Sequence, residues 1–171
     1  VVMNKLPDQL DANRDCGLAQ IALKTPSGLL AFGFGTGLSP YAPGTAGTIA
    51  AIPFAIALKH LDGFWFWLML VTAFVLGVWV CGRVSEKMGV HDHGGIVWDE
   101  MVGYWLAVAF VPAQWEWLLA AFIAFRFFDI LKPWPIKQLD KNVSGGFGIM
   151  IDDVLAAMYT MALLRLAQLI F

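Results

Sequence analysis

Apolar residues gather in five long runs, and short stretches rich in glycine, proline and charge separate them. About 20 helical residues cross the hydrocarbon core of a bilayer, so the length of each run decides whether it can span. The run 64–82 just spans, while the runs near 48–61 and 98–111 are short. The pattern predicts an all-α integral membrane protein, a bundle of about five transmembrane or half-spanning helices at 48–61, 64–82, 98–111, 114–131 and from 152 onward.

The segment 29–47 follows a different pattern. Four glycines and two prolines fall between residues 33 and 44, which disfavours a regular helix. We expect a short helix followed by a Gly-rich re-entrant loop, because irregular backbone at membrane depth must lie within protein or face a polar cavity. Residues 1–28 are polar and predict a cytoplasmic tail or interfacial helix, and 29–171 predict one membrane-embedded catalytic domain.

Composition supports the membrane assignment. The 171 residues are 59% hydrophobic and 14% charged, and their mean hydropathy is +0.69, which is too apolar for an ordinary soluble domain. A net charge of −2 argues against a nucleic-acid partner, which requires a basic surface. Two cysteines make neither a disulfide framework nor a CxxC motif.

The charged residues are unevenly placed. If the predicted helices cross in turn, only Lys59, Arg165, Asp62 and Glu116 fall away from one face. That face carries the lysine and arginine excess, so it is predicted to be cytoplasmic.

The stretch VHDHGGIVWDEMVG at 90–103 holds the densest polar group, comprising His91, Asp92, His93, Asp99 and Glu100. Acids at a membrane edge indicate a functional site. Carboxylate oxygens suit Mg²⁺ or Mn²⁺. Alternatively, the acids only favour the start of a helix, or the HxH pair binds a softer metal.

The second candidate is PGTAGT at 43–48. Its glycines, hydroxyls and helix start could form a phosphate-binding nest from Thr45, Gly47 and Thr48. The P-loop signature is missing. A plain glycine turn with Thr48 as N-cap is the alternative.

The third candidate is FRFFDILKPWPI at 125–136. Arg126, Asp129 and Lys132 are spaced to share roughly one helix face. The carboxylate could hold a cation while the two bases hold phosphate oxygens. A row of structural salt bridges is the alternative.

The fourth candidate is the pair Asp152 and Asp153, expected at the start of the last helix, where the alternative is that one of them is only an N-cap. Neighbouring helix ends would bring five acids together, and such a group needs a divalent cation to limit repulsion. Metal-assisted phosphate-ester hydrolysis follows as the simplest reaction. The predicted metal ligands are Asp99, Glu100, Asp129, Asp152 and Asp153; the catalytic candidates are His91, Asp92, His93, Asp129 and Lys132; the phosphate-binding candidates are Thr45, Gly47, Thr48, Arg126 and Lys132.

The blocks LSPYAPGTAGT, GVHDHGGIVWDE, FRFFDILKPWPI and DKNVSGGFGIMIDD resemble the phosphatidylglycerophosphatase A family in order and spacing, over about 29–157. The resemblance implies a bacterial inner-membrane, multi-pass enzyme with its site facing the cytoplasm. It also implies Mg²⁺ dependence, a phosphatidylglycerophosphate substrate and a phosphatidylglycerol product. The first 28 residues and the last helix carry no family signature.

A membrane cation carrier is the rival function, because intramembrane acids also mark ion paths. Carriers usually place charge near the midplane and often contain inverted repeats. Here the acids gather at one face and the sequence has no evident repeat, which favours the enzyme. The oligomeric state is left open.

Overall fold

The computed structural model describes residues 19–90 and 93–170. Every regular element in these two ranges is helical, which confirms the predicted all-α class. His91 and Asp92 lie outside the described residues, as does segment 1–18. The elements are α2 (Pro26–Ala31), η1 (Gly33–Leu38), α3 (Pro43–Leu58), α4 (Gly63–Met88), α5 (Trp98–Ala107), α6 (Trp115–Leu131), α7 (Ile136–Asn142) and α8 (Gly145–Ile170).

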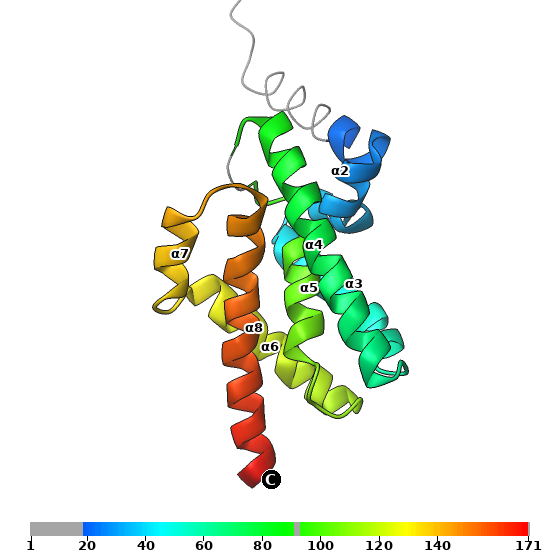
Figure 1. Cartoon of the computed structure of the whole chain (residues 1–171), viewed down its shortest axis with the longest axis vertical. Helices are drawn as coiled ribbons and strands as arrows, with labels where there is room; N and C mark the ends of the chain where they lie inside the picture. The colour runs from blue at the N-terminus through cyan, green and yellow to red at the C-terminus, as the bar shows by residue number, and fades with distance from the viewer. Residues whose placement is uncertain (1–18, 91–92, 171) are drawn as a thin grey trace, which may run out of the picture.

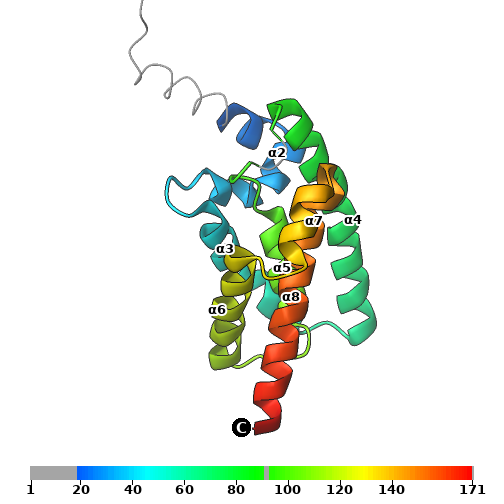
Figure 2. The same cartoon turned by 90° about the vertical axis from the view of Figure 1, so that its left-hand side faces the viewer.

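Helix α5 is the centre of the fold. Helices α3, α4, α6 and α8 all pack against it, as Figures 1 and 2 show. Met101 and Tyr104 of α5 are fully buried. The Tyr104 hydroxyl donates a 2.9 Å hydrogen bond to the Leu118 carbonyl of α6, so its polar end is satisfied inside the core. Most side chains on α5 are therefore buried among those of the surrounding helices.

Several helix ends point the same way. The N-terminal ends of α3, α5 and α8 and the C-terminal end of α6 face the end of the molecule that carries α2 (Figures 1 and 2). The α3–α4 and α5–α6 connections lie toward the opposite end, with the C-terminus. Polar residues near those four helix ends are thereby placed in one half of the molecule.

Helices α4 and α8 are long and apolar enough to cross a membrane. Each has 26 residues, which corresponds to roughly 39 Å of helix. Large apolar side chains on α4, among them Trp65, Val71 and Val75, are exposed. This exposure suits contact with lipid, and together with composition it indicates a membrane protein.

Several helix boundaries differ from the expected ones. Helix α3 ends at Leu58 rather than 61, and α7 is a helix that was not expected. Helix α3 begins at Pro43 rather than 48, and α4 continues past 82 to Met88. Helix α5 ends at Ala107 rather than 111, and α8 begins at Gly145 rather than 152. Proline is well suited to the first turn of a helix, and α4 ends only where Gly89 adopts a left-handed conformation.

The Gly-rich stretch before α3 is compact. Residues Gly33–Leu38 form two 3₁₀ turns joined at a kink, where Phe34 has φ 58° and Gly35 has φ 99°. The Val97 N–H donates to the Ala31 carbonyl at 2.8 Å, which ties α2 to the segment before α5. Whether this stretch re-enters a membrane stays a prediction.

Candidate active site

Three carboxylates from two helices meet in the bundle. Asp99 and Glu100 occupy the first turn of α5, and Asp153 comes from α8. One oxygen from each lies within 4.8 Å of the others. Asp99 is 7% exposed and Asp153 only 2%. Gly103 on α5 permits this approach, because a Cβ there would lie 3.1 Å from the Asp153 Cβ.

Arg126 of α6 borders this acid cluster (Asp99, Glu100 and Asp153). Its Nη1 lies 2.6 Å from Asp129 Oδ2 and 3.6 Å from Glu100 Oε1. The Arg126 Nε is buried and finds no hydrogen-bond partner among the described residues. An arginine that holds two carboxylates and keeps an unused donor is suited to bind an oxyanion beside them.

The first turn of α3 lies directly against these groups. A Cβ built on Gly44 would overlap Glu100 Oε1 and lie 3.0 Å from Arg126 Nη1. No side chain caps this helix start, and Ala42 at the N-cap position cannot do so. The backbone of α3 therefore brings the positive end of a helix dipole beside the acid cluster.

Gly47 and Thr48 of PGTAGT take part in packing contacts of α3. Thr48 is buried, and its hydroxyl donates to the Gly44 carbonyl at 2.8 Å within the helix. A Cβ at Gly47 would lie 2.6 Å from Val97 Cβ, so this glycine allows α3 to approach the α5 entry. Thr48 is also not the N-cap, because α3 begins five residues earlier. Thr45 is partly buried in the first turn.

Lys132 leaves the row that its spacing predicted. It follows the last residue of α6 and adopts the left-handed region, with φ 44°, so it stands outside the regular helix that carries Arg126 and Asp129. Its ammonium lies 2.8 Å from Asp140 Oδ1 and 2.7 Å from Asp152 Oδ2. Burial lowers the pKa of Lys132, but hydrogen bonds and attraction from the two carboxylates outweigh it and raise the pKa above its ordinary value.

The predicted acids are thus divided between two bases. Glu100 and Asp129 contact Arg126, whereas Asp152 contacts Lys132 and accepts from the Asp153 backbone N–H at 3.1 Å. Asp152 and Asp153 lie two turns inside α8 and not at its start, so the capping alternative is wrong.

His93 is the described member of the HDH motif. Its Nδ1 accepts a 3.0 Å hydrogen bond from the Gly95 N–H, and its ring lies 6.3 Å from that of Phe32. His93 is not one of the residues of the acid cluster.

Sequence reasoning assigned no role to two residues at this site. Gly44 belongs to the PGTAGT motif, but its contact with Glu100 and Arg126 depends on how α3 packs against α5 and α6. Asp140 lies on α7, eight residues after Lys132, and pairs with it. Asp140 is the first residue of the block DKNVSGGFGIMIDD, and that position was the only signal for it in the sequence.

The donor set fits a hard divalent cation. All three clustered donors are carboxylate oxygens, as Mg²⁺ and Mn²⁺ prefer. Glu100 Oε2 is buried without a hydrogen-bond partner in the described part of the chain. A buried acceptor of this kind is costly, and a cation would satisfy it.

Fold and site together define a class: an all-helical membrane protein with a buried acid cluster that could bind a metal. The family model for phosphatidylglycerophosphatase A matches residues 29–168, and the chain belongs to that family. Phosphatidylglycerophosphatase A of Escherichia coli K12 is 43% identical over 156 residues, covering 91% of each chain.

Two further relatives match the chain at similar identity. Phosphatidylglycerophosphatase A of Haemophilus influenzae is 51% identical over 144 residues, covering 83% of this chain and 88% of the relative. A Bacteroides thetaiotaomicron protein, provisionally named phosphatidylinositol-3-phosphatase, is 41% identical over 148 residues, covering 82% of this chain and 92% of its own. No solved structure matches.

Proposed function

We propose that the protein is a Mg²⁺-dependent lipid phosphatase that hydrolyses the terminal phosphate monoester of phosphatidylglycerophosphate. The products are phosphatidylglycerol and inorganic phosphate. The observation that carries the proposal is the meeting of Asp99, Glu100 and Asp153 beside Arg126 and the start of α3. Family membership supplies the substrate class.

The residues divide into two roles. Asp99, Glu100 and Asp153 hold the cation, and Asp129 orients Arg126 and adds negative charge at the edge of the group. A bound Mg²⁺ supplies Lewis-acid polarisation of a phosphate oxygen and offsets developing charge. Arg126 and the N–H groups of the first turn of α3 bind the remaining phosphate oxygens.

Lys132 acts mainly as a positioning residue. An ammonium has three donors, and two of them are used by Asp140 and Asp152. The third is available to a phosphate oxygen. Fixing Asp152 also fixes its neighbour Asp153 on the same turn of α8. Hydrolysis adds the oxygen of water to phosphorus and a proton to the leaving alcohol oxygen, and the HDH motif, with His93, is the candidate proton carrier.

The proposed function also implies a location for the site and a route for the lipid. The site is proposed to face the cytoplasm of a bacterial inner membrane in a multi-pass protein, with the lipid substrate entering from the bilayer. The clustering of charge at one end of the helices supports this orientation. The carrier alternative has less support, because family membership and the phosphate-binding groups both favour an esterase.

The test is phosphate release by the purified protein from phosphatidylglycerophosphate in detergent, with phosphatidylinositol 3-phosphate as a second substrate. We expect release from the first lipid only in the presence of Mg²⁺, and much slower release from the second. Asp62→Asn, at the α3–α4 connection, is the matched control beside Asp153→Asn. Full activity of Asp153→Asn would contradict the proposed site, and preference for the inositol lipid would reassign the substrate.

A further inference from the structure

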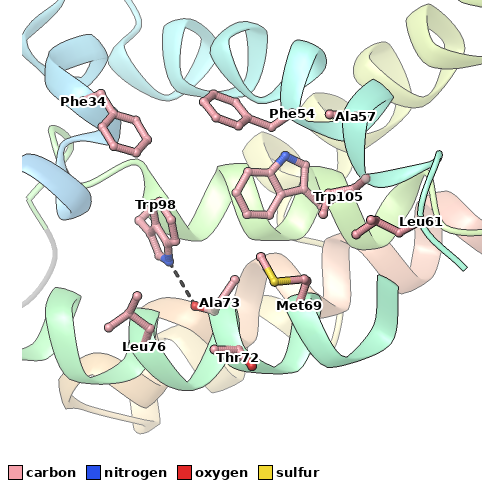
Figure 3. Close-up of a pocket in the computed structure, with 11 residues that line it drawn as sticks. Phe34, Phe54, Ala57, Leu61, Met69, Thr72, Ala73, Leu76, Trp98 and Trp105 are labelled. Atoms are coloured by element: carbon pink, nitrogen blue, oxygen red, sulfur yellow. Dashed lines mark hydrogen bonds between the residues drawn. The ribbon is translucent and has the colours of Figure 1, made fainter. Parts of the chain in front are cut away.

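An apolar groove lies between α3 and α4, over α5. It encloses about 420 Å³, a volume typical of pockets for small ligands. Trp98 and Trp105 of α5 line it, together with residues of both flanking helices, as Figure 3 shows. The remaining lining residues are Phe34, Phe54, Ala57, Leu58, Leu61, Met69, Thr72, Ala73 and Leu76.

The polar atoms of this groove are already satisfied within the protein. The Trp98 indole N–H donates to the Ala73 carbonyl of α4 at 3.0 Å, and the Trp105 indole N–H donates to the Ala51 carbonyl of α3 at 3.0 Å. The Thr72 hydroxyl donates to the Leu68 carbonyl of its own helix at 2.7 Å. The occupant therefore receives only apolar contact, which selects hydrocarbon over a polar ligand.

The two tryptophans also keep the groove open. They lie seven residues apart on one face of α5, and their rings meet edge to face at 5.7 Å. Each is fixed by its hydrogen bond to a different wall, Trp98 to α4 and Trp105 to α3. The groove is thus built from rigid, internally bonded side chains.

The groove reaches the same two helices that carry the candidate active site, α3 and α5. Trp98 immediately precedes the metal-ligand candidate Asp99 on α5. Gly44 in the first turn of helix α3 lies against Glu100, and the same helix continues along the groove through Phe54 to Leu58. The groove residue Trp98 is therefore one residue from Asp99 along α5, and Trp105 lies seven residues farther along the same helix.

Phe34 marks the end of the groove nearest the site. Its backbone has φ 58°, an unfavourable conformation for a residue with a Cβ. The ring is half exposed and contacts Phe54 at 6.0 Å and Trp98 at 6.3 Å. Backbone strain that places an aromatic ring at an opening is characteristic of a binding site.

From these observations we infer that the groove binds one acyl chain of the phosphatidylglycerophosphate substrate, which sets the headgroup against the acid cluster. This inference rests on the proposed function and adds a chain-binding subsite to it. A chain that leaves bilayer hydrocarbon for the groove gains little from the hydrophobic effect. The gain is orientation, since a held chain limits the positions that the headgroup can adopt.

The kinetic test compares diacyl phosphatidylglycerophosphate with its deacylated, chain-free form. Ala57→Phe fills the groove from an exposed position that needs no core repacking, and Ile56→Phe adds the same ring to the neighbouring exposed residue outside the lining. We expect Ala57→Phe to lower kcat/KM for the diacyl substrate by about tenfold, or ~1.4 kcal/mol. Hydrolysis of the chain-free substrate and both activities of Ile56→Phe should stay unchanged. An equal loss on both substrates, or no loss with the diacyl lipid, would overturn the inference.

A second measurement does not depend on turnover. Phosphatidylglycerophosphate with a diazirine in mid-chain should label the peptides that contain Phe54 and Met69, and Ala57→Phe should abolish this labelling. Excess unlabelled substrate lipid should compete, whereas phosphatidylethanolamine should not. Equal competition by both would identify a bystander bilayer lipid and overturn the inference. Correct labelling by a protein that hydrolyses nothing would support the groove while the proposed function failed.

Discussion

Gly44 gives the sharpest prediction, because Glu100 and Arg126 leave no room at this position for a side chain larger than hydrogen. The alanine Cβ would overlap Glu100 Oε1 and lie 3.0 Å from Arg126 Nη1, whereas ordinary contact begins at 3.4 Å. Relief requires a shift on the order of 1 Å in Glu100, Arg126 or the start of α3. A misplacement of that size in reacting groups costs about 10²-fold in rate. We therefore expect Gly44→Ala to lower kcat/KM about a hundredfold.

The matched control is Gly63→Ala at the first residue of α4, where a Cβ meets no heavy atom within 4 Å. Phosphate release and thermal stability in detergent are measured for both variants. Alanine is the better helix former by up to about 1 kcal/mol, which offsets part of the cost of the overlap, and the thermal midpoint shows how much stability Gly44→Ala retains. Turnover of Gly44→Ala within threefold of the parent would refute the claim that Gly44, Glu100 and Arg126 form one site.

Three further predictions concern charge and topology. Asp129→Asn should fold normally but lose about 10²–10³ in turnover, or roughly 3–4 kcal/mol of transition-state stabilisation. The reason is that Arg126 loses the carboxylate that lies 2.6 Å from its Nη1. Near-normal kinetics would show that the pair of Arg126 and Asp129 is only structural. Lys132→Ala should turn over far more slowly than the parent, and Lys132→Arg should recover part of the rate. Asp140→Asn should lower the rate less than Lys132→Ala does, because Asp152 still holds the ammonium. A larger loss in Asp140→Asn than in Lys132→Ala, measured side by side, would contradict this. Cysteines introduced at positions 62 and 90 and labelled from outside the cell should react only at 62, and labelling at 90 alone would reverse the proposed orientation.

The meeting of Asp99, Glu100 and Asp153 was predictable from the sequence. Acids before and within apolar runs are rare, and alternating helices bring such positions to one end of a bundle. The contact between Arg126 and Asp129 was predictable for a simpler reason, since residues i and i+3 share a helix face.

The start of α8 was not predictable from local propensity. Glycines 145, 146 and 148 have low helix propensity, but a Cβ at Gly146 would overlap the Val78 carbonyl, and one at Gly82 would lie 3.1 Å from the Gly146 nitrogen. Gly82 and Gly146 allow α4 and α8 to pack closely, as small residues do in membrane helices. Tertiary packing therefore outweighs the low helix propensity, and the acids end up two turns inside the helix.

Lys132 shows a second limit of the sequence. Glycine or asparagine usually adopts the left-handed conformation after a helix, so a lysine with φ 44° had no local signal. The ion pairs with Asp140 and Asp152 compensate for that conformation, and both partners come from helices that follow later in the chain. From its spacing alone, Lys132 could only be expected to continue the row of Arg126 and Asp129 along α6.

The central claim is that the acid cluster holds the divalent cation that phosphate release requires. It is tested most directly by titrating Mn²⁺ into the purified protein and following free Mn²⁺ by its spin-resonance signal, with Mg²⁺ as competitor. We predict saturable uptake that Mg²⁺ displaces and that is lost in Asp153→Asn but retained in Asp62→Asn. Unchanged Mn²⁺ affinity in Asp153→Asn would contradict the account.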